Sequence, residues 1–214
     1  MDLIKELRTR TQAGIADCKK ALEQTDGDLD AAVKFLREKG LIAAAKKAGR
    51  VASEGLVEAY IHPGGRVGVL VEVNCETDFV AKTEGFQQFV RDIAMHIAAS
   101  PETEFVSRDE VPHDVIERER AVFAAEAKNE GKPERVLEKI VDGKLEKLFF
   151  KRSCLLEQDF IKNPDVTIEQ LLKENVAKMG ENITIRRFVR YERGEGIVKP
   201  KSDLAAEVAE QLGQ

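Results

Sequence analysis

The sequence contains no tryptophan and only two tyrosines among its 214 residues. Proteins that hold single-stranded nucleic acid usually stack the bases on aromatic side chains, and the supply here is too small for such a platform. An excess of basic residues is missing as well, because the formal net charge is -5. Nucleic-acid-binding proteins usually carry a basic surface that faces the phosphates. We therefore expect no direct binding to nucleic acid.

Long apolar runs and paired cysteines are also scarce. No segment reaches the ~18 consecutive apolar residues that a membrane helix requires, so we expect no membrane association. The first residues, Met1–Glu6, lack the basic and apolar regions of a signal peptide. Cys18, Cys75 and Cys154 are an odd and widely scattered set, which argues against a secreted disulfide framework. Together these absences predict a cytoplasmic protein.

Recognisable catalytic and cofactor motifs are missing too. There is no phosphate-binding Gly-rich loop, no paired-cysteine or HExxH zinc motif, and no GxSxG nucleophile turn. His62, His96 and His113 lie far apart and show no metal-ligand spacing. We therefore expect no cofactor, no metal and no chemical catalysis, and a function that is exerted by docking onto another protein. An enzyme without a recognisable motif is the weakest alternative.

The first fifty residues carry a helical pattern. Apolar residues recur at helical spacing in three segments, the clearest of which is Leu29–Leu36, and Gly40 predicts the end of that helix. Residues 46–53 are typical of a linker or an extended arm. The pattern predicts a compact helical module over residues 1–52. So small a module is expected to gain stability from a neighbour or a partner.

The pattern then changes to strands. Residues 56–61 and 67–73 alternate in character around the turn signal at 62–65, which predicts an antiparallel hairpin. A third strand is expected where Ile183, Ile185 and Val189 alternate with polar residues. Helices are predicted at 86–97 and 168–176, and an αα-hairpin at about 113–150. The fold class is therefore α+β: a core domain over 53–198 with a small antiparallel sheet packed with helices, and a C-terminal helical module over 199–214.

One segment, Glu72–Lys82, has no explanation in composition alone. A valine-rich strand ends there, and Thr77 and Asp78 are suited to capping a helix start. Phe79 follows before the next amphipathic pattern begins. This ring either packs the helix entry onto the core or lies on a protruding corner as an anchor for a pocket of a partner. The pattern leaves both interpretations open.

This segment resembles the second signature of the bacterial elongation factor Ts family, and Leu7–Leu22 resembles its first signature. Further similarity runs through residues 46–49, 93–99, 160–162 and 180–187, so essentially the whole chain is covered. Two departures stand out. Gln12 lies where the family often has glycine, and fuller-length members carry two copies of the core subdomain where this chain has one.

The resemblance implies a guanine-nucleotide exchange factor that binds elongation factor Tu, both GDP-bound and nucleotide-free, during translation elongation. It implies a ubiquitin-associated-like three-helix fold for the N-terminal module. It also implies that Asp78 and Phe79, between Thr77 and Val80, intrude into the nucleotide domain of the partner near its magnesium site, with help from His62. Further contacts are implied for two groups: Ile15, Ala16, Lys19 and Lys47 in the first module, and Ile161 and Lys162 near residue 160.

For a short, single-core chain the resemblance further implies that two copies pair as a homodimer, giving a 2:2 complex with the partner. Two alternatives of other classes stay open. The helical module could serve an adaptor that binds some other protein. Binding to nucleic acid would rest on four arginines of the last strand, although arginines at a strand edge usually pair with carboxylates: Arg186, Arg187, Arg190 and Arg193.

Overall fold

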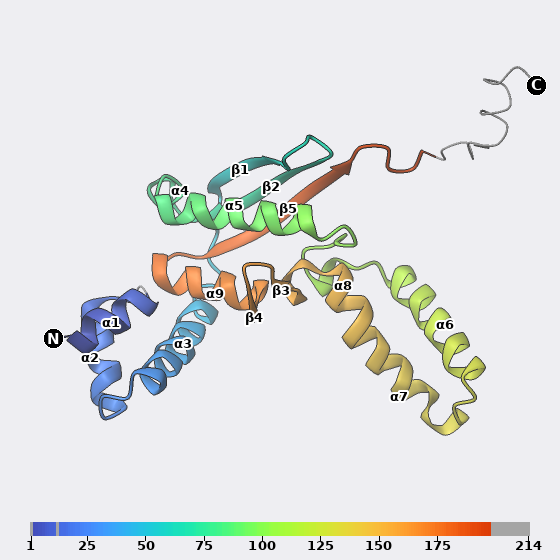
Figure 1. The fold of residues 1–214 in the computed structure, drawn as a ribbon, viewed down its shortest axis with the longest axis horizontal. Coiled ribbons are helices and arrows are strands. Elements are labelled where there is room, and N and C mark those ends of the chain that lie inside the picture. The colour runs from blue at the N-terminus through green and yellow to red at the C-terminus, as the bar shows by residue number, and fades with distance from the viewer. Residues whose placement is uncertain (1, 12, 198–214) are drawn as a thin grey trace, which may run out of the picture.

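The computed structural model describes residues 2–11 and 13–197, so the predicted C-terminal helical module at 199–214 lies outside the described residues. Three N-terminal helices, α1 (Asp2–Thr11), α2 (Ile15–Gln24) and α3 (Leu29–Ala45), pack around one small core of their own (Figure 1). That core is formed by Leu7, Cys18, Ala21, Leu22 and Ala32. The predicted three-helix arrangement is confirmed.

Helix α3 does not end at Gly40, so this part of the prediction is wrong. The helix continues to Ala45 because Gly40 lies where α3 packs on helix α9 (Ile168–Met179). A Cβ atom on Gly40 would lie 3.2 Å from the Cβ of Ala177. Arg37 strengthens the same contact through an ion pair with Glu174 at 2.9 Å. The glycine therefore permits close helix packing, and the N-terminal module rests on the core through it.

The core contains a three-stranded antiparallel sheet in the order β1 (Glu54–Ile61), β2 (Val67–Cys75), β5 (Ile183–Glu192). Helix α5 (Glu84–Ala99) covers one face of this sheet (Figure 1). The alternating valines of β2 are buried against the apolar stripe of α5, as the two periodicities predicted. The sequence did not indicate the short second sheet, β3 (Asp159–Phe160) with β4 (Asn163–Thr167).

The last strand differs from its predicted pattern. Ile183 and Ile185 are buried, but Val189 is 37% exposed. The cause is a bulge: Val73 pairs with Ile185 and Glu72 with Arg187, so Arg186 is an extra residue in β5. One extra residue moves every later side chain to the opposite face. Phe188 and not Val189 consequently packs against the core.

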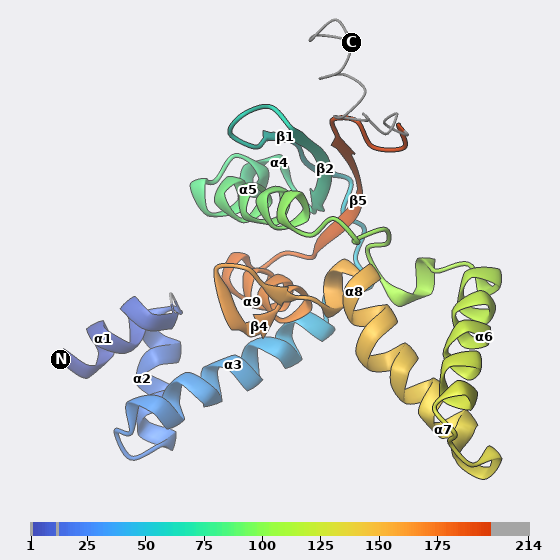
Figure 2. The ribbon, with the colours of Figure 1, turned by 45° about the vertical axis from the view of Figure 1, so that its right-hand side comes forward.

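The αα-hairpin is confirmed as α6 (His113–Asn129) and α7 (Glu134–Lys144), which continues through a π-helical turn, Leu145–Phe150, into α8 (Lys151–Ser153). It forms an arm on the opposite side of the molecule from the N-terminal helices (Figure 2). The π turn brings Phe149 into the core of the arm, whereas the neighbouring Leu148 is exposed. No helix among the described residues is long and apolar enough to cross a membrane.

Candidate protein-binding site

Phe79 lies on a corner between the sheet and its covering helix. The corner is helix α4 (Asp78–Ala81), a single turn that begins directly after β2. Thr77 caps it, because its hydroxyl accepts a hydrogen bond from the N–H of Val80 at 3.4 Å. Val80 and Ala81 pack against the core, whereas Phe79 is 80% exposed. The ring therefore does not pack the helix entry onto the core, which leaves the interpretation of Phe79 as an exposed anchor.

Glu181, in the turn between α9 and β5, holds the backbone beneath this ring. Its carboxylate accepts hydrogen bonds from the N–H of Glu76 at 3.1 Å, the N–H of Thr77 at 3.0 Å and the hydroxyl of Thr77 at 2.6 Å. Hydrogen bonds to an ionised acceptor are among the stronger ones in proteins. The ring of Phe79 thus projects from a backbone that is held in place by these hydrogen bonds.

The corner also carries a charged pair. Lys82 donates a hydrogen bond to Asp78 at 2.6 Å. This hydrogen bond lowers the pKa of Asp78 and raises the pKa of Lys82, so both groups are charged at neutral pH. Below them, the thiol of Cys75 is buried and donates to the carbonyl of Thr77 at 3.1 Å. Burial raises the pKa of Cys75, so this thiol is protonated and is part of the core.

His62 lies far from the corner within one chain. It occupies the turn between β1 and β2, where its Nδ1 is 3.2 Å from the hydroxyl of Tyr60. The register pairs Ile61 with Gly68 at that end of the hairpin and Glu54 with Cys75 at the other. Phe79 follows the second end, so the full length of β1 separates the two side chains. The structure does not bring His62 and Phe79 together.

Ile161 and Lys162 form the two-residue tip of the β3–β4 turn, and helix α5 fastens this tip at two points. The N–H of Ile161 donates to Nδ1 of His96 at 3.3 Å, and Lys162 forms an ion pair with Asp92 at 2.7 Å. Asp92 and His96 are four residues apart, on one face of the helix. The side chain of Ile161 stays half exposed above these two attachments.

His96 is 2% exposed and has a defined protonation state. Burial lowers its pKa, so the imidazole is neutral at neutral pH. Because Nδ1 accepts from Ile161, Nε2 carries the proton and donates to Oε1 of Gln158 at 2.8 Å. Gln158 is fixed in turn by its bonds to Thr103 and to the carbonyl of Arg152. His96 thus supports the tip from within the core.

The N-terminal module presents a separate surface. Ile15, Ala16 and Lys19 are exposed at the start of α2, and Lys19 lies 3.8 Å from Glu23. Lys47 is half buried in the turn after α3. An ion pair between Asp17 and Lys39 places the start of α2 beside the second half of α3, which leads to Lys47. The four residues therefore lie toward one end of the module.

Three of the four arginines considered for nucleic-acid binding have carboxylate partners. Arg186 and Arg187 both bind Glu72, at 2.8 and 2.7 Å, and Arg190 binds Glu192 at 2.9 Å. The hydrogen bond from Arg186, followed by that from Arg187, lowers the pKa of Glu72. Glu72 neutralises only one of the two arginines that it binds, so this pairing reduces the positive charge of the strand without removing it.

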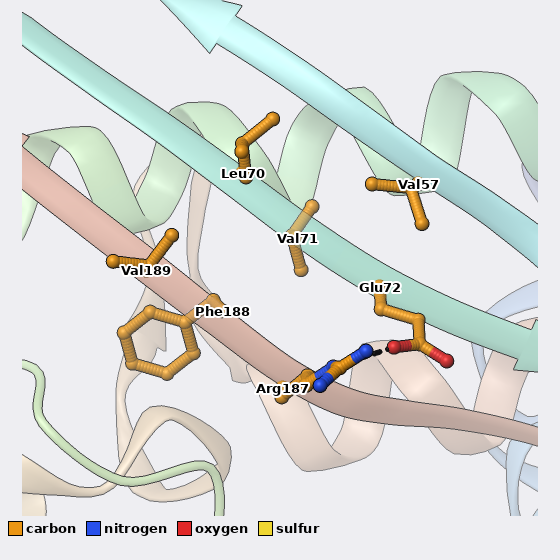
Figure 3. Close-up of a pocket in the computed structure, with 7 residues that line it drawn as sticks. All are labelled: Val57, Leu70, Val71, Glu72, Arg187, Phe188 and Val189. Atoms are coloured by element: carbon orange, nitrogen blue, oxygen red, sulfur yellow. Dashed lines mark hydrogen bonds and ion pairs between the residues drawn. The ribbon is translucent and has the colours of Figure 1, made fainter.

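The outer face of the sheet carries an apolar groove of about 320 Å³ (Figure 3). Val57, Leu70 and Val189 project from three neighbouring strands on this face, with the Glu72–Arg187 pair at one end (Figure 3). Within residues 2–11 and 13–197 no helix lies over this outer face, whereas α5 covers the opposite face of the sheet (Figure 1). Among residues 2–11 and 13–197, no group of three or more His, Cys, Asp or Glu side chains is arranged to hold a metal.

Comparison with known proteins establishes the family. The family model described as Elongation factor TS matches residues 4–195. The chain belongs to the elongation factor Ts family. Elongation factor Ts of Carboxydothermus hydrogenoformans is 64% identical over 207 residues, which cover 97% of this chain and 94% of that protein. Elongation factor Ts of Syntrophomonas wolfei is 62% identical over 211 residues, covering 99% and 98% of the two chains. This chain is therefore a translation elongation factor, and it takes part in protein biosynthesis.

Two supporting residues were missed by sequence reasoning: Glu181 and His96. Neither lies in the two signatures that carry the elongation factor Ts resemblance, although both fall in the shorter similar stretches. Their partners are distant in sequence, because Glu181 binds Thr77 across 104 residues and His96 binds Ile161 across 65. The i,i+4 spacing of Asp92 and His96 was the only local signal for either of them.

Proposed function

We propose that this protein is a guanine-nucleotide exchange factor, which binds elongation factor Tu with GDP or without nucleotide and accelerates the release of GDP. The observation that carries the proposal is Phe79, an aromatic ring 80% exposed on a corner whose backbone is fixed by Glu181. Exposed aromatic anchors on rigid bases are typical hot spots of protein–protein interfaces. Membership of the elongation factor Ts family supports this choice of partner. The expected location is the cytoplasm, where translation takes place.

The proposed mechanism involves no bond cleavage. A GTPase holds GDP through a phosphate-binding loop and a coordinated magnesium ion. When Phe79 enters between packed helices of the nucleotide domain, these helices must shift, and the magnesium and phosphate contacts weaken. Exchange factor and nucleotide then weaken the binding of each other by the same factor, as linkage requires. Asp78, held ionised by Lys82, enters the partner together with the ring.

Two further surfaces supply affinity away from the nucleotide in this proposal. The exposed start of α2, with Ile15, Ala16 and Lys19, contacts the nucleotide domain together with Lys47. The tip formed by Ile161 and Lys162 contacts another domain of the partner. Exposure of most of these residues, and the fixed backbone of the tip, support this assignment. Phe79 then enters a partner that is already bound through these two surfaces.

A homodimer, formed through the outer face of the sheet, belongs to the same proposal. Val57, Leu70 and Val189 form an apolar patch that no described helix covers, beside Glu72 and the two arginines that bind it, Arg186 and Arg187. A patch with both charges is complementary to itself under the two-fold symmetry of most dimers.

A second copy lying antiparallel on this face would bring its His62 toward Phe79 of the first. One chain alone keeps the two at opposite ends of the sheet. Sedimentation tests the pairing: Leu70→Glu should convert a dimer into a monomer, whereas Val122→Glu, at an exposed site on the arm, should not. A wild-type monomer at micromolar concentration would exclude it.

The exchange proposal is tested with elongation factor Tu loaded with a fluorescent GDP analogue. Wild-type protein at substoichiometric amounts should accelerate release, because a factor that dissociates after each event acts repeatedly. Val122→Ala removes an exposed apolar side chain on the arm and should keep full activity. Tight binding to a folded partner other than a GTPase, without acceleration for elongation factor Tu, would favour the adaptor alternative.

A further inference from the structure

Glu181 lies at the centre of a hydrogen-bond network beneath the Phe79 corner. It receives three hydrogen bonds from only two residues, Glu76 and Thr77. The hydroxyl of Thr77 bridges two groups, since it donates to Glu181 at 2.6 Å and accepts from the N–H of Val80 at 3.4 Å. The carboxylate therefore orients the side chain that caps α4 as well as the backbone that leads into it.

A reciprocal set of bonds closes the network. Oε1 of Glu76 accepts a hydrogen bond from the N–H of Asn182 at 2.6 Å and is 3.5 Å from the guanidinium of Arg50. The side chain of Asn182, which is buried, donates to the carbonyl of Arg50 at 2.8 Å. Three distant segments thus meet at one point: the linker after the N-terminal module, the end of β2 and the turn before β5.

Helix α4 depends on this network because it has only four residues. A single helical turn is not stable alone, since nucleation fixes several dihedral angles for one hydrogen bond. The turn is kept by the Thr77 cap and by Val80 and Ala81, which pack on the core. Phe79 itself contributes little packing, so the direction in which its ring projects is set by the backbone that Glu181 holds.

We propose that Glu181 is a positioning residue for nucleotide exchange, which acts by fixing the direction of Phe79. This inference rests on the proposed function of Phe79. Loss of the carboxylate leaves the acceptor position of two N–H groups and one hydroxyl unfilled, and the corner samples other orientations. Part of the binding free energy is then spent on ordering the corner in the complex. The surfaces at α2 and at the β3–β4 tip are unaffected, so the protein still binds its partner.

The test is a double-mutant cycle of Glu181→Gln and Phe79→Ala, read as the rate of fluorescent GDP release from elongation factor Tu at saturating factor. Glutamine keeps the size of the side chain but places an NH₂ group among the donors. We expect the maximal rate to fall about tenfold, equivalent to one hydrogen bond to a charged group. The concentration giving half of that rate should change much less. In the Phe79→Ala background, Glu181→Gln should have no further effect.

Glu169→Gln is the matched control, because Glu169 pairs with Lys173 at 2.6 Å in the first turn of α9, away from the corner. It should leave the rate unchanged. If Glu181→Gln and Phe79→Ala lower the release rate by factors that multiply in the double mutant, Glu181 does not act through Phe79, and the inference is overturned. If Glu181→Gln releases GDP at the wild-type rate while Phe79→Ala is slow, the inference on Glu181 is overturned and the proposed function stands. A wild-type rate for Phe79→Ala would overturn both the inference and the proposed function. If Glu181→Gln does not fold, Thr77→Val removes the shortest of the three bonds and enters the same cycle.

Discussion

Two phenylalanines seven positions apart should lose very different amounts of stability on the same substitution. Phe79 is 80% exposed, whereas Phe86 is completely buried under the sheet. Phe86→Ala removes a packed ring and leaves a cavity, which costs about 3–5 kcal/mol of unfolding free energy. Full burial of such a side chain is worth about 1.5–3 kcal/mol, and about a fifth of Phe79 is buried, so Phe79→Ala should cost about 0.5 kcal/mol.

Urea unfolding followed by far-ultraviolet circular dichroism measures both values, since the sequence offers no tryptophan as a fluorescent probe. In a chain of this length, 1 kcal/mol corresponds to a shift of about 2–4 °C in melting temperature. Phe79→Ala should therefore melt within about 2 °C of wild type, and Phe86→Ala more than about 6 °C lower. Equal destabilisation by the two substitutions would mean that the ring of Phe79 is packed in the core, and the anchor interpretation would be refuted.

Three further predictions concern other parts of the chain. Because burial lowers the pKa of His96 below its ordinary 6.5, the unfolded chain takes up a proton first as the pH falls. The free energy of unfolding should therefore decline below about pH 6.5. His96→Asn should make this decline shallower in urea titrations, and an unchanged decline would mean that other groups cause it. Gly40→Val should cost about 1–3 kcal/mol where α3 packs on α9, whereas Gly143→Val, with nothing within 4 Å, should cost less; equal losses would exclude the packing argument. Lys19→Glu should weaken binding to elongation factor Tu in titration calorimetry without changing stability, and unchanged affinity would leave Lys19 as a solvated surface lysine.

Local periodicity was sufficient to predict most helices and strands of this chain. The valine alternation of β2 and the stripe of α5 are buried as expected, because each is a property of consecutive residues. The errors arose where a distant segment decides the local structure. Gly40 lies inside a helix because α9 packs against it, and the bulge at Arg186 exists only in the pairing of β5 with β2. Neither partner is visible in the local sequence.

The candidate site shows the same division. Thr77 could be predicted as a helix cap from its residue type and position, and the structure confirms this. The direction of Phe79 could not be predicted, because an aromatic residue at a helix start follows the same pattern whether it points inward or outward. Glu181 decides this direction from 104 residues away. The separation of His62 from Phe79 likewise depends on strand register, which the sequence of one strand does not contain.

The role of Phe79 in exchange is tested by comparing binding with GDP release for Phe79→Ala. Its affinity for nucleotide-free elongation factor Tu is measured by titration, and its effect on GDP release is measured by stopped flow with the fluorescent analogue. Phe79→Ala is expected to fold and to bind through the remaining surfaces, but to lose most of its acceleration of GDP release. Full acceleration by a folded Phe79→Ala variant would show that this ring does not open the nucleotide site.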